Sequence, residues 1–377
     1  MKKVLYVATS DIHIKTFHIP YLKWLAENGC DVDLAVENRG NLKIPYVKKV
    51  FYLTFPRTPL SLTNISSYKD LKRIINENNY KIIHCHTPVP GVLTRLAARK
   101  TRKNGTKVLY TVHGFHFFKG ARLINWLLYY PVEYLLSSFT DVIITMNKED
   151  FNYVNGKMYH KESFLVPGVG VDSKVFYPFN ENKILEERKK LGLNPDHFIL
   201  LYVAEFIHRK NHKMIIDSIP VLKTRIPDIK ILFAGKGLLL EKMKISVAEK
   251  GIDEHIIFLG FRNDINILSA ISDVGISASR QEGLPVGLLQ EMFCAKPVVA
   301  PYERGHNELI INKVNGFLFN QEDNQGFTEC IFKLYSDKSL RAQMGMKSLE
   351  RAQLFSVVNS LETMASIYRR YLQIRLI

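Results

Sequence analysis

Short apolar runs alternate with helical segments from the start of the chain, and this alternation limits the possible folds more than any other feature of the sequence. Runs typical of strands cover residues 3–9, 31–36, 81–87, 108–114 and 141–147. Segments with helical spacing of apolar residues lie between them, at 18–29, 69–79 and 89–105, and residues 10–17 are predicted to form a turn. Strands that alternate with helices predict a parallel sheet with helices on both faces.

The same alternation begins again after residues 166–178, which are rich in glycine and proline, as linkers often are. Strands are predicted at 199–206, 229–235, 256–261, 274–279 and 297–301, and helices at 211–219, 238–251 and 263–272. A chain of 377 residues also exceeds the size at which one hydrophobic core usually keeps growing. We therefore predict an α/β protein of two doubly wound, Rossmann-like domains that face each other across a cleft. The expected domains are 1–175 and 176–360, with a C-terminal helix at 361–377 that could return to the first domain.

The net charge of +16 is unevenly distributed, because three quarters of the excess positive charge lies in residues 1–174. Such a basic half could bind a nucleic acid, an anionic membrane surface or a phosphorylated substrate. The alternative is a solvated basic face that binds no partner. No apolar run reaches the ~20 residues that cross a bilayer, and the first residues read as a strand rather than a signal peptide. The four cysteines show no CxxC spacing, which is typical of reduced thiols in the cytoplasm.

Polar loops follow each predicted strand of the second half, where ligands bind in doubly wound sheets. Arg209 and Lys210 stand just before a helix N-terminus, where backbone N–H groups and the helix dipole favour an anion. The turn from Gly235 to Gly237 permits close backbone approach, although by itself it is more typical of a plain tight turn. Together with the loop that contains Phe261 and Arg262, these segments predict a pocket for a diphosphate.

The segment EGLPVGLLQE, residues 282–291, carries an acidic residue at each end. Pro285 suits the first position of a helix, which places Gln290 and Glu291 on its second turn. Neighbouring helical residues differ in direction by roughly 100°, so these two cannot both face one pocket. Nothing nearby in the sequence would raise the pKa of either acid, so a general acid/base pair is not expected. Ligand binding fits these acids better than acid/base catalysis, because a carboxylate can accept paired hydrogen bonds from the vicinal hydroxyls of a sugar.

The run SRQEGLPVGLLQEMFCAKPVVAPYERGHNELI, followed by VNGFLF, resembles the signature region of retaining glycosyltransferases of family 4. The similarity to bacterial exopolysaccharide and capsule members extends over essentially the whole chain. The resemblance implies the GT-B fold and transfer of a hexose or N-acetylhexosamine from a UDP-sugar to a saccharide acceptor, expected to be lipid-linked. No metal or other cofactor is expected, because no Asp-x-Asp site is apparent and basic side chains would replace a divalent ion.

The resemblance also implies roles on the donor side. Glu282 matches the acid that lies beside the transferred sugar, within a donor-binding segment that continues through Gly283, Leu284 and Pro285. Gln290 occupies the place of the family's second acid, and Glu291 stands where alanine is usual. Either residue could therefore contact the ribose.

The diphosphate of the donor requires positive groups, since charge develops on it as the sugar leaves. Lys210 matches one of the family's two basic residues at this position, and Arg209 is the available substitute for the other. Arg280 is a further candidate, although a solvated loop arginine is an equal possibility.

Candidates for the acceptor side lie in the first half. By resemblance, His113 matches a histidine near the reacting sugar, and we expect it to take part in catalysis. Ser10, Asp11 and His13 follow the first strand and are expected to face the acceptor, with a plain polar turn as the alternative. His116 is the last candidate, with a packed or solvated histidine as its alternative.

Two other functions fit parts of the sequence. A UDP-sugar epimerase of the same architecture would need UDP but no acceptor, and a nucleic-acid-binding protein would use the positive charge alone. The second lacks zinc-finger, RNP-type and helix-turn-helix signals. Residues 115–136 combine aromatic, basic and apolar residues, which fits a core helix or a peripheral contact with the anionic cytoplasmic face of the cell membrane.

Overall fold

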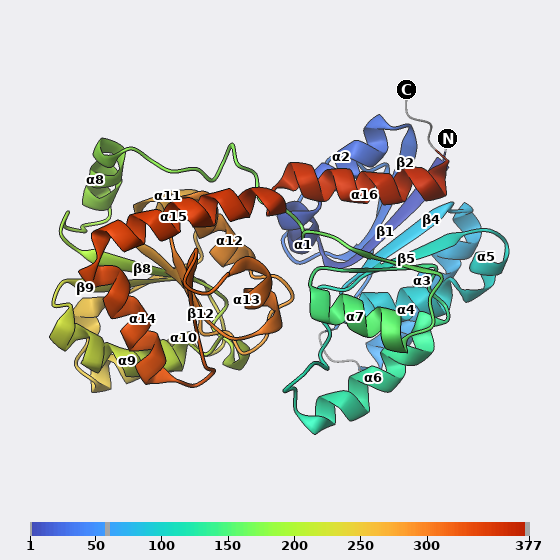
Figure 1. Cartoon of the computed structure of the whole chain (residues 1–377). Helices are drawn as coiled ribbons and strands as arrows, with labels where there is room; N and C mark the ends of the chain where they lie inside the picture. The colour runs from blue at the N-terminus through green and yellow to red at the C-terminus, as the bar shows by residue number, and fades with distance from the viewer. Residues whose placement is uncertain (1, 57–60, 374–377) are drawn as a thin grey trace. The chain divides into compact units, whose positions relative to one another are not determined.

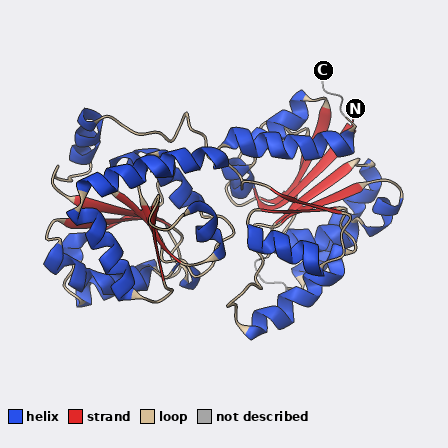
Figure 2. Ribbon diagram, in the orientation of Figure 1, coloured by secondary structure: helices blue, strands red, loops and turns tan. Residues whose placement is uncertain are grey.

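The computed structural model describes residues 2–56 and 61–373. The chain divides into two compact units, of which the first comprises Met1–Gly170 and Val357–Ile377 and the second Val171–Ser356 (Figures 1 and 2). The C-terminal helix α16 (Val357–Leu372) belongs to the first unit and packs on α2 (Ile19–Glu27). Its Tyr368 hydroxyl lies 2.7 Å from Nδ1 of His84, and its Ser360 hydroxyl donates to the carbonyl of Pro167.

The first unit contains a parallel sheet of seven strands in the order β3-β2-β1-β4-β5-β6-β7. In this sheet Val4 of β1 pairs with Val32 of β2 on one side and with Ile82 of β4 on the other. The chain order thus reverses between β1 and β4, which is where Rossmann-like sheets bind ligands. The strands are β1 (Lys2–Ser10), β2 (Cys30–Glu37), β3 (Lys49–Tyr52), β4 (Ile82–His86), β5 (Lys107–Thr111), β6 (Val142–Thr145) and β7 (Glu162–Leu165).

Helices connect these strands, and side-chain caps fix where two of them begin. The Ser10 hydroxyl accepts a hydrogen bond from the His13 N–H at the start of α1 (Asp11–Phe17), and Asn147 caps α7 (Lys148–Lys157) in the same way. Gly29 follows α2 with φ +77°, a conformation that glycine adopts without strain. The remaining helices of this unit are α3 (Thr63–Asn78), α4 (Pro88–Ala97), α5 (Arg99–Lys103) and α6 (Leu123–Ser137).

The second unit contains a parallel sheet of six strands in the order β10-β9-β8-β11-β12-β13, so its order reverses between β8 and β11. The strands are β8 (Phe198–Val203), β9 (Ile229–Ala234), β10 (Ile256–Gly260), β11 (Val274–Ile276), β12 (Val298–Pro301) and β13 (Gly316–Phe319). The helices are α8 (Glu181–Lys190), α9 (His212–Arg225), α10 (Leu240–Glu249), α11 (Ile265–Ile271), α12 (Val286–Phe293), α13 (Arg304–Leu309), α14 (Asn324–Ser336) and α15 (Lys338–Ala352), with short 3-10 turns η1 (His208–Lys210), η2 (Asp253–His255) and η3 (Gln353–Phe355).

Each unit has its own hydrophobic core, built on strands that are buried on both faces. Residues 4–8 of β1 and residues 199–201 of β8 are almost completely inaccessible to solvent. Such continuous apolar strands are typical of parallel sheets with helices on both sides. The cores hold the carboxyl ends of the strands in fixed positions, and the candidate site residues follow these ends.

Parts of the structure differ from the sequence-based prediction. Within the predicted turn 10–17, residues 11–17 form helix α1, because Ser10 supplies an N-cap. The predicted helix 89–105 is divided at Ala98 into α4 and α5, and Pro285 is the N-cap of α12 rather than its first helical residue. The units divide after Gly170 and Ser356 instead of after residues 175 and 360. Among the described helices, none is long and apolar enough to cross a membrane.

Candidate active site

An ion pair between Lys210 and Glu282 lies at the carboxyl ends of two neighbouring strands. Lys210 belongs to η1 after β8, and Glu282 lies between β11 and α12. The Lys210 ammonium donates to Oε1 of Glu282, and Nη1 of Arg209 lies 3.6 Å from the other carboxylate oxygen. Because β8 and β11 pair in parallel, their carboxyl ends lie side by side. Lys210 and Glu282, which are 72 positions apart in the sequence, therefore meet there.

These two cations determine the charge of Glu282. Burial by itself would raise the pKa of its carboxyl, but Lys210 and Arg209 outweigh this effect and lower the pKa to about 2. Glu282 is therefore an anion at neutral pH. It can accept hydrogen bonds from hydroxyl groups or stabilise positive charge, but it cannot serve as a general acid.

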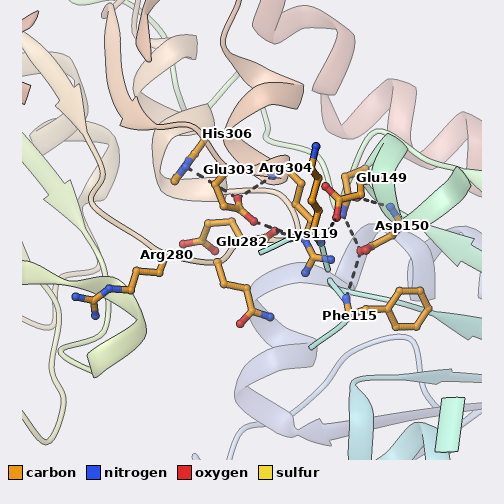
Figure 3. A network of polar contacts seen from close by, with 12 residues as sticks. Phe115, Lys119, Glu149, Asp150, Arg280, Glu282, Glu303, Arg304 and His306 are labelled. Atoms are coloured by element: carbon orange, nitrogen blue, oxygen red, sulfur yellow. Dashed lines mark hydrogen bonds and ion pairs between the residues drawn. The ribbon is translucent and has the colours of Figure 1, made fainter. Parts of the chain in front are cut away.

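The first turn of helix α13, which follows β12, also supports Glu282 (Figure 3). Nε of Arg304 lies 3.2 Å from the Glu282 carbonyl oxygen and donates to it. A Cβ atom on Gly305 would lie 2.8 Å from Cβ of Glu282 and 2.9 Å from its carbonyl oxygen, so only glycine fits here without displacement. His306 is buried, contacts the carbonyl of Pro301 and the hydroxyl of Ser277, and has a pKa that burial lowers to about 4.

Glu303 is a second buried carboxyl beside this ion pair. It caps α13 by accepting the N–H of Gly305 at 2.8 Å, and burial raises its pKa to about 7. The sequence analysis assigned no role to Glu303, Arg304 or His306. Their position directly after β12, in the series of polar loops at strand ends, was the available signal.

Arg280 positions the basic loop rather than presenting an unpaired charge. Its guanidinium forms a salt bridge with Glu322 and donates to the carbonyl of His208 and the side chain of Asn211. It therefore ties η1 to the loop after β13. Arg209 donates in turn to the carbonyl of Gln281 at 2.8 Å.

The two glycines after β9, Gly235 and Gly237, allow the backbone there to pack closely against the backbone of the loop after β8. A Cβ atom at Gly235 would lie 1.9 Å from the carbonyl oxygen of Ala204, and one at Gly237, where φ is +156°, would lie 2.5 Å from that of Phe206. The loops after β8 and β9 thus pack directly on each other, which explains both glycines without a ligand.

The loop after β10 contains the other two donor-side candidates. Phe261 is largely exposed, with the Lys236 ammonium 5.8 Å from its ring centre. Arg262 pairs with Asp264 through Nε at 2.7 Å. Because β10 is next to β9 in the parallel sheet, this loop lies at the same edge as Gly235 and Gly237.

Helix α12 presents its two polar residues to different surroundings. Gln290 is half-buried, whereas Glu291 is completely buried against β11, where a Cβ atom on Gly275 would overlap its carboxylate. Neither carboxylate oxygen of Glu291 has a hydrogen-bond partner among the described residues, and burial raises its pKa well above the ordinary value. The expectation that nothing nearby would raise the pKa of an acid in this segment is therefore wrong for Glu291. The N-terminal part of the segment contains Gly283, the buried Leu284 and the N-cap Pro285.

In the first unit, histidines gather at the carboxyl ends of β1, β4 and β5. His13 and His18 share a contact of 3.0 Å between their Nε2 atoms, and Nδ1 of His86 lies 3.3 Å from Nε2 of His113. His84 completes the group, with its ring 4.1 Å from that of His86. The sequence analysis singled out His13 and His113 but missed the other three, because no local pattern shows that they converge.

The other acceptor-side candidates have local structural roles. Ser10 caps α1, and the buried Asp11 carboxylate accepts backbone N–H bonds from the loop at residues 39–42. Burial would raise the pKa of Asp11, but these donors lower it below the ordinary value. His116 stacks on Tyr129 of α6, and the nearby Phe115 N–H donates to Asp150 (Figure 3).

The two units, each with a parallel sheet between helices, form the GT-B fold. The crystal structure of Anabaena HepE in complex with UDP-glucose has the same fold, with a TM-score of 0.79 and 19% identity over 98% of this chain and 100% of that chain. Residues 3–147 match the family model described as glycosyl transferase 4-like, and residues 183–351 match glycosyl transferases group 1.

Sequence relatives define the family further. A putative glycosyltransferase of Bacillus subtilis, EpsD, is 42% identical over 375 residues, which cover 98% of this chain and 97% of EpsD. An Escherichia coli enzyme named UDP-Gal:alpha-D-GlcNAc-diphosphoundecaprenol alpha-1,3-galactosyltransferase is 28% identical over 82% of each chain. The chain belongs to family 4, the group 1 glycosyltransferases.

Proposed function

We propose that the protein transfers a hexose or N-acetylhexosamine, with retention of configuration, from a UDP-sugar to a lipid-linked saccharide during synthesis of a cell-surface polysaccharide. The name of the Escherichia coli relative specifies a UDP-sugar donor and a diphosphoundecaprenol acceptor. HepE, of the same fold, has been crystallised with UDP-glucose. Both observations support a UDP-sugar as the donor for this chain.

The contact of Glu282 with Lys210 and Arg209 is the observation that carries the proposal. As the bond between sugar and UDP breaks, negative charge develops on the diphosphate and positive charge on the sugar. Lys210 and Arg209 would stabilise the first, and the ionised Glu282 would lie beside the second. Removing one preorganised donor of this kind costs about 2.7–4 kcal/mol of transition-state stabilisation. In this proposal the basic side chains take the place of a divalent ion at the diphosphate.

The remaining donor contacts would come from the same edge of the sheet. Gln290 is the half-buried polar residue of α12, and its amide would bond a ribose hydroxyl. The exposed ring of Phe261 and the guanidinium of Arg262 would contact the nucleotide. The segment from Gly283 to Pro285 would contact the sugar through its backbone.

His113 would act on the acceptor side, close to the reacting sugar. Burial lowers its pKa well below the ordinary value, so the ring is neutral at pH 7 and can donate one hydrogen bond and accept another. A neutral ring can orient a sugar hydroxyl without repelling the positive charge that develops on the transferred sugar.

A lipid-linked acceptor would require the enzyme to reach a membrane surface, and α6 offers an apolar face for this contact. Six apolar side chains of this helix are exposed, at positions 123, 124, 127, 128, 132 and 135. At 100° per residue they occupy about half of the helix circumference. The opposite half packs on the core through Trp126, Tyr129 and Tyr130.

Basic residues lie at both ends of this face. Lys119 and Arg122 precede the helix and are exposed, and Arg99 of α5 lies 5.8 Å from the ring of Phe139 just beyond its end. Apolar burial combined with basic flanks is typical of peripheral binding to anionic lipid. We therefore assign α6 to contact the cytoplasmic face of the cell membrane.

A donor and acceptor screen tests the proposed function. UDP-glucose, UDP-galactose and their N-acetyl forms are compared by thermal shift and then supplied with lipid diphosphate saccharides, with mass spectrometry of the lipid product. One donor is expected to raise the melting temperature and extend the lipid-linked saccharide by one sugar. Interconversion of UDP-sugars without any extended lipid would favour an epimerase instead.

A further inference from the structure

His86, the last residue of β4, contacts His113, the histidine that the proposed function places on the acceptor side. Nδ1 of His86 lies 3.3 Å from Nε2 of His113. Burial lowers the pKa of both rings well below the ordinary value, so both are neutral at pH 7. A neutral imidazole has one N–H group and one nitrogen that only accepts a hydrogen bond. One of the two rings must therefore donate to the other.

The surroundings of His86 favour this residue as the donor. If His113 donated instead, the proton of His86 would lie on Nε2. That atom is buried and has no hydrogen-bond partner among the described residues. A buried N–H group without a partner is rarer in proteins than an unpaired acceptor, so the proton of His86 is better placed on Nδ1. His113 then accepts a hydrogen bond at Nε2 and carries its own proton on Nδ1.

We propose that His86 is a positioning residue, which fixes the nitrogen of His113 that carries the proton. The inference rests on the proposed function and deepens it, because it gives His113 a defined role as a donor to a sugar oxygen through Nδ1–H. No hydrogen bond joins Nδ1 of His113 to another described residue, so this nitrogen is available to the substrate. A bond at one ring nitrogen commonly determines the protonation of the other.

The ring of His86 is packed between other rings of the first unit. Tyr6 of β1 stacks on it, with the ring centres 4.6 Å apart and an angle of 25° between the planes. The ring of His84 lies 4.1 Å away, and His86 itself is buried. A side chain in such a close-packed position cannot turn over without displacing its neighbours. Nδ1 of His86 therefore stays directed toward His113.

The backbone directly after His86 is strained. Thr87 has a φ of +66°, which is an outlier for a β-branched residue. Its hydroxyl lies 2.7 Å from that of Thr9 in β1 and donates to the carbonyl of His86. Strained residues persist where surrounding contacts hold them, and they cluster at functional sites. The strain lies between β1 and β4, where the strand order of the first sheet reverses, and it supports a functional role for the end of β4.

NMR of the full-length protein labelled with ¹⁵N-histidine tests the inference without any substrate. Long-range ¹H–¹⁵N correlation distinguishes protonated from unprotonated ring nitrogens, and His113→Gln identifies the signals of that ring. In the wild type, His113 should be protonated at Nδ1 and not at Nε2. His86→Phe keeps an aromatic ring but has no donor, so the proton of His113 should move at least in part to Nε2. His160→Phe is the matched control, because His160 contacts the carbonyl of Met158, and it should leave the His113 signals unchanged.

Initial rates of UDP release in the presence of acceptor connect this protonation to transfer. His86→Phe should lower kcat by about tenfold, as expected for one lost hydrogen bond, with little change in KM for the UDP-sugar. His86→Asn should recover most of the rate, because its amide N–H can take the place of Nδ1–H.

The inference is overturned if His113 of the wild type is protonated at Nε2, or if His86→Phe leaves its protonation or kcat unchanged. The wild-type spectrum decides the question even if His86→Phe does not fold. Absence of transfer with every acceptor would contradict the proposed function instead, and the spectra would still test the role of His86.

Discussion

The ammonium group of Lys210 donates a hydrogen bond to the buried carboxylate of Glu282, and this contact joins the loop after β8 to the loop after β11. The pair lies at the point where the strand order of the second sheet reverses. The same cation keeps the acid ionised, since burial alone would raise its pKa. A change at either residue or at its supports should therefore affect both the charge and the position of the other.

Gly305 supports Glu282, and we predict that Gly305→Ala lowers the transfer rate by about 10- to 100-fold. A displacement of a catalytic side chain by about 1 Å can reduce the rate by this factor. The added methyl group would meet backbone and Cβ atoms of Glu282 and displace them. Initial rates at saturating donor measure the effect. Gly156→Ala is the matched control, because a Cβ atom at this helical position meets no atom within 4 Å. Equal rates for both variants would contradict the supporting role of Gly305.

Gln290 and Glu291 are predicted to differ in their effect on donor binding. Gln290→Glu should keep or improve UDP binding, since a carboxylate forms stronger hydrogen bonds with ribose hydroxyls than an amide does. Glu291→Ala should leave UDP affinity nearly unchanged, because this side chain is buried against β11. Isothermal titration with UDP compares the two. Loss of affinity in Glu291→Ala with no effect of Gln290→Glu would reverse the assignment.

Glu291 should also make the stability of the protein depend on pH. Its folded pKa is raised above the ordinary value of 4.5, so its contribution to stability is present below pH 4.5 and is lost as the pH rises toward the folded pKa. Over this range the unfolding free energy should fall by up to ~1.4 kcal/mol per pH unit on account of this group. Glu291→Gln should remove that part of the slope.

Urea unfolding between pH 5 and pH 8, about the range in which proteins are usually most stable, measures the effect. The difference in unfolding free energy between Glu291→Gln and wild type should become more favourable to the variant as the pH rises. Glu362→Gln, at an exposed position, should follow the wild-type profile. Parallel profiles for Glu291→Gln and wild type would show that Glu291 is not protonated in the native state.

Helix α6 should control binding to membranes. The protein should float with vesicles that contain phosphatidylglycerol and bind less as salt increases, because the basic flanks attract anionic lipid. Leu127→Glu with Leu128→Glu should abolish flotation, and Lys119→Glu with Arg122→Glu should weaken it. Leu238→Glu is the control, since Leu238 is 94% exposed but lies in the second unit. Equal recovery with neutral vesicles, or unchanged flotation of the leucine variant, would exclude this mode of binding.

The alternation of strands and helices was enough to predict both sheets, because strands buried on both faces are continuous apolar runs. It did not reveal β3, β7 or β13, which have four residues each, and those of β3 and β7 are only partly buried or exposed. It also missed α1, although the Ser10 cap was visible in the sequence, since the seven residues of this helix lack a clear apolar stripe. Short elements at sheet edges depend on tertiary contacts that no local pattern encodes.

The candidate site was predictable where residues follow strands. Lys210 and Glu282 were placed on the donor side from the sequence, and the structure brings them into contact. Their neighbours Glu303 and His306 were not assigned, because their roles depend on burial and on hydrogen bonds between segments that are far apart in the sequence. The gathering of His18, His84 and His86 depends in the same way on strand order, which periodicity does not specify.

Lys210→Ala should abolish most transfer and weaken UDP binding. The expected rate loss is about 10²–10³-fold, as for removal of one donor from a preorganised anion site. Without Lys210 the pKa of the buried Glu282 should also rise. Lys213→Ala, which removes an exposed lysine paired with Asp217, is the matched control and should retain both activities.

Release of UDP from the donor sugar, measured with and without a lipid-linked saccharide acceptor, tests the central claim most directly. The wild type should release UDP only when the acceptor is present, in a one-to-one ratio with glycosylated lipid, and Lys210→Ala should release little under the same conditions. Acceptor-independent conversion of the UDP-sugar, or a wild-type rate in Lys210→Ala, would contradict transfer at the site that Lys210 and Glu282 form.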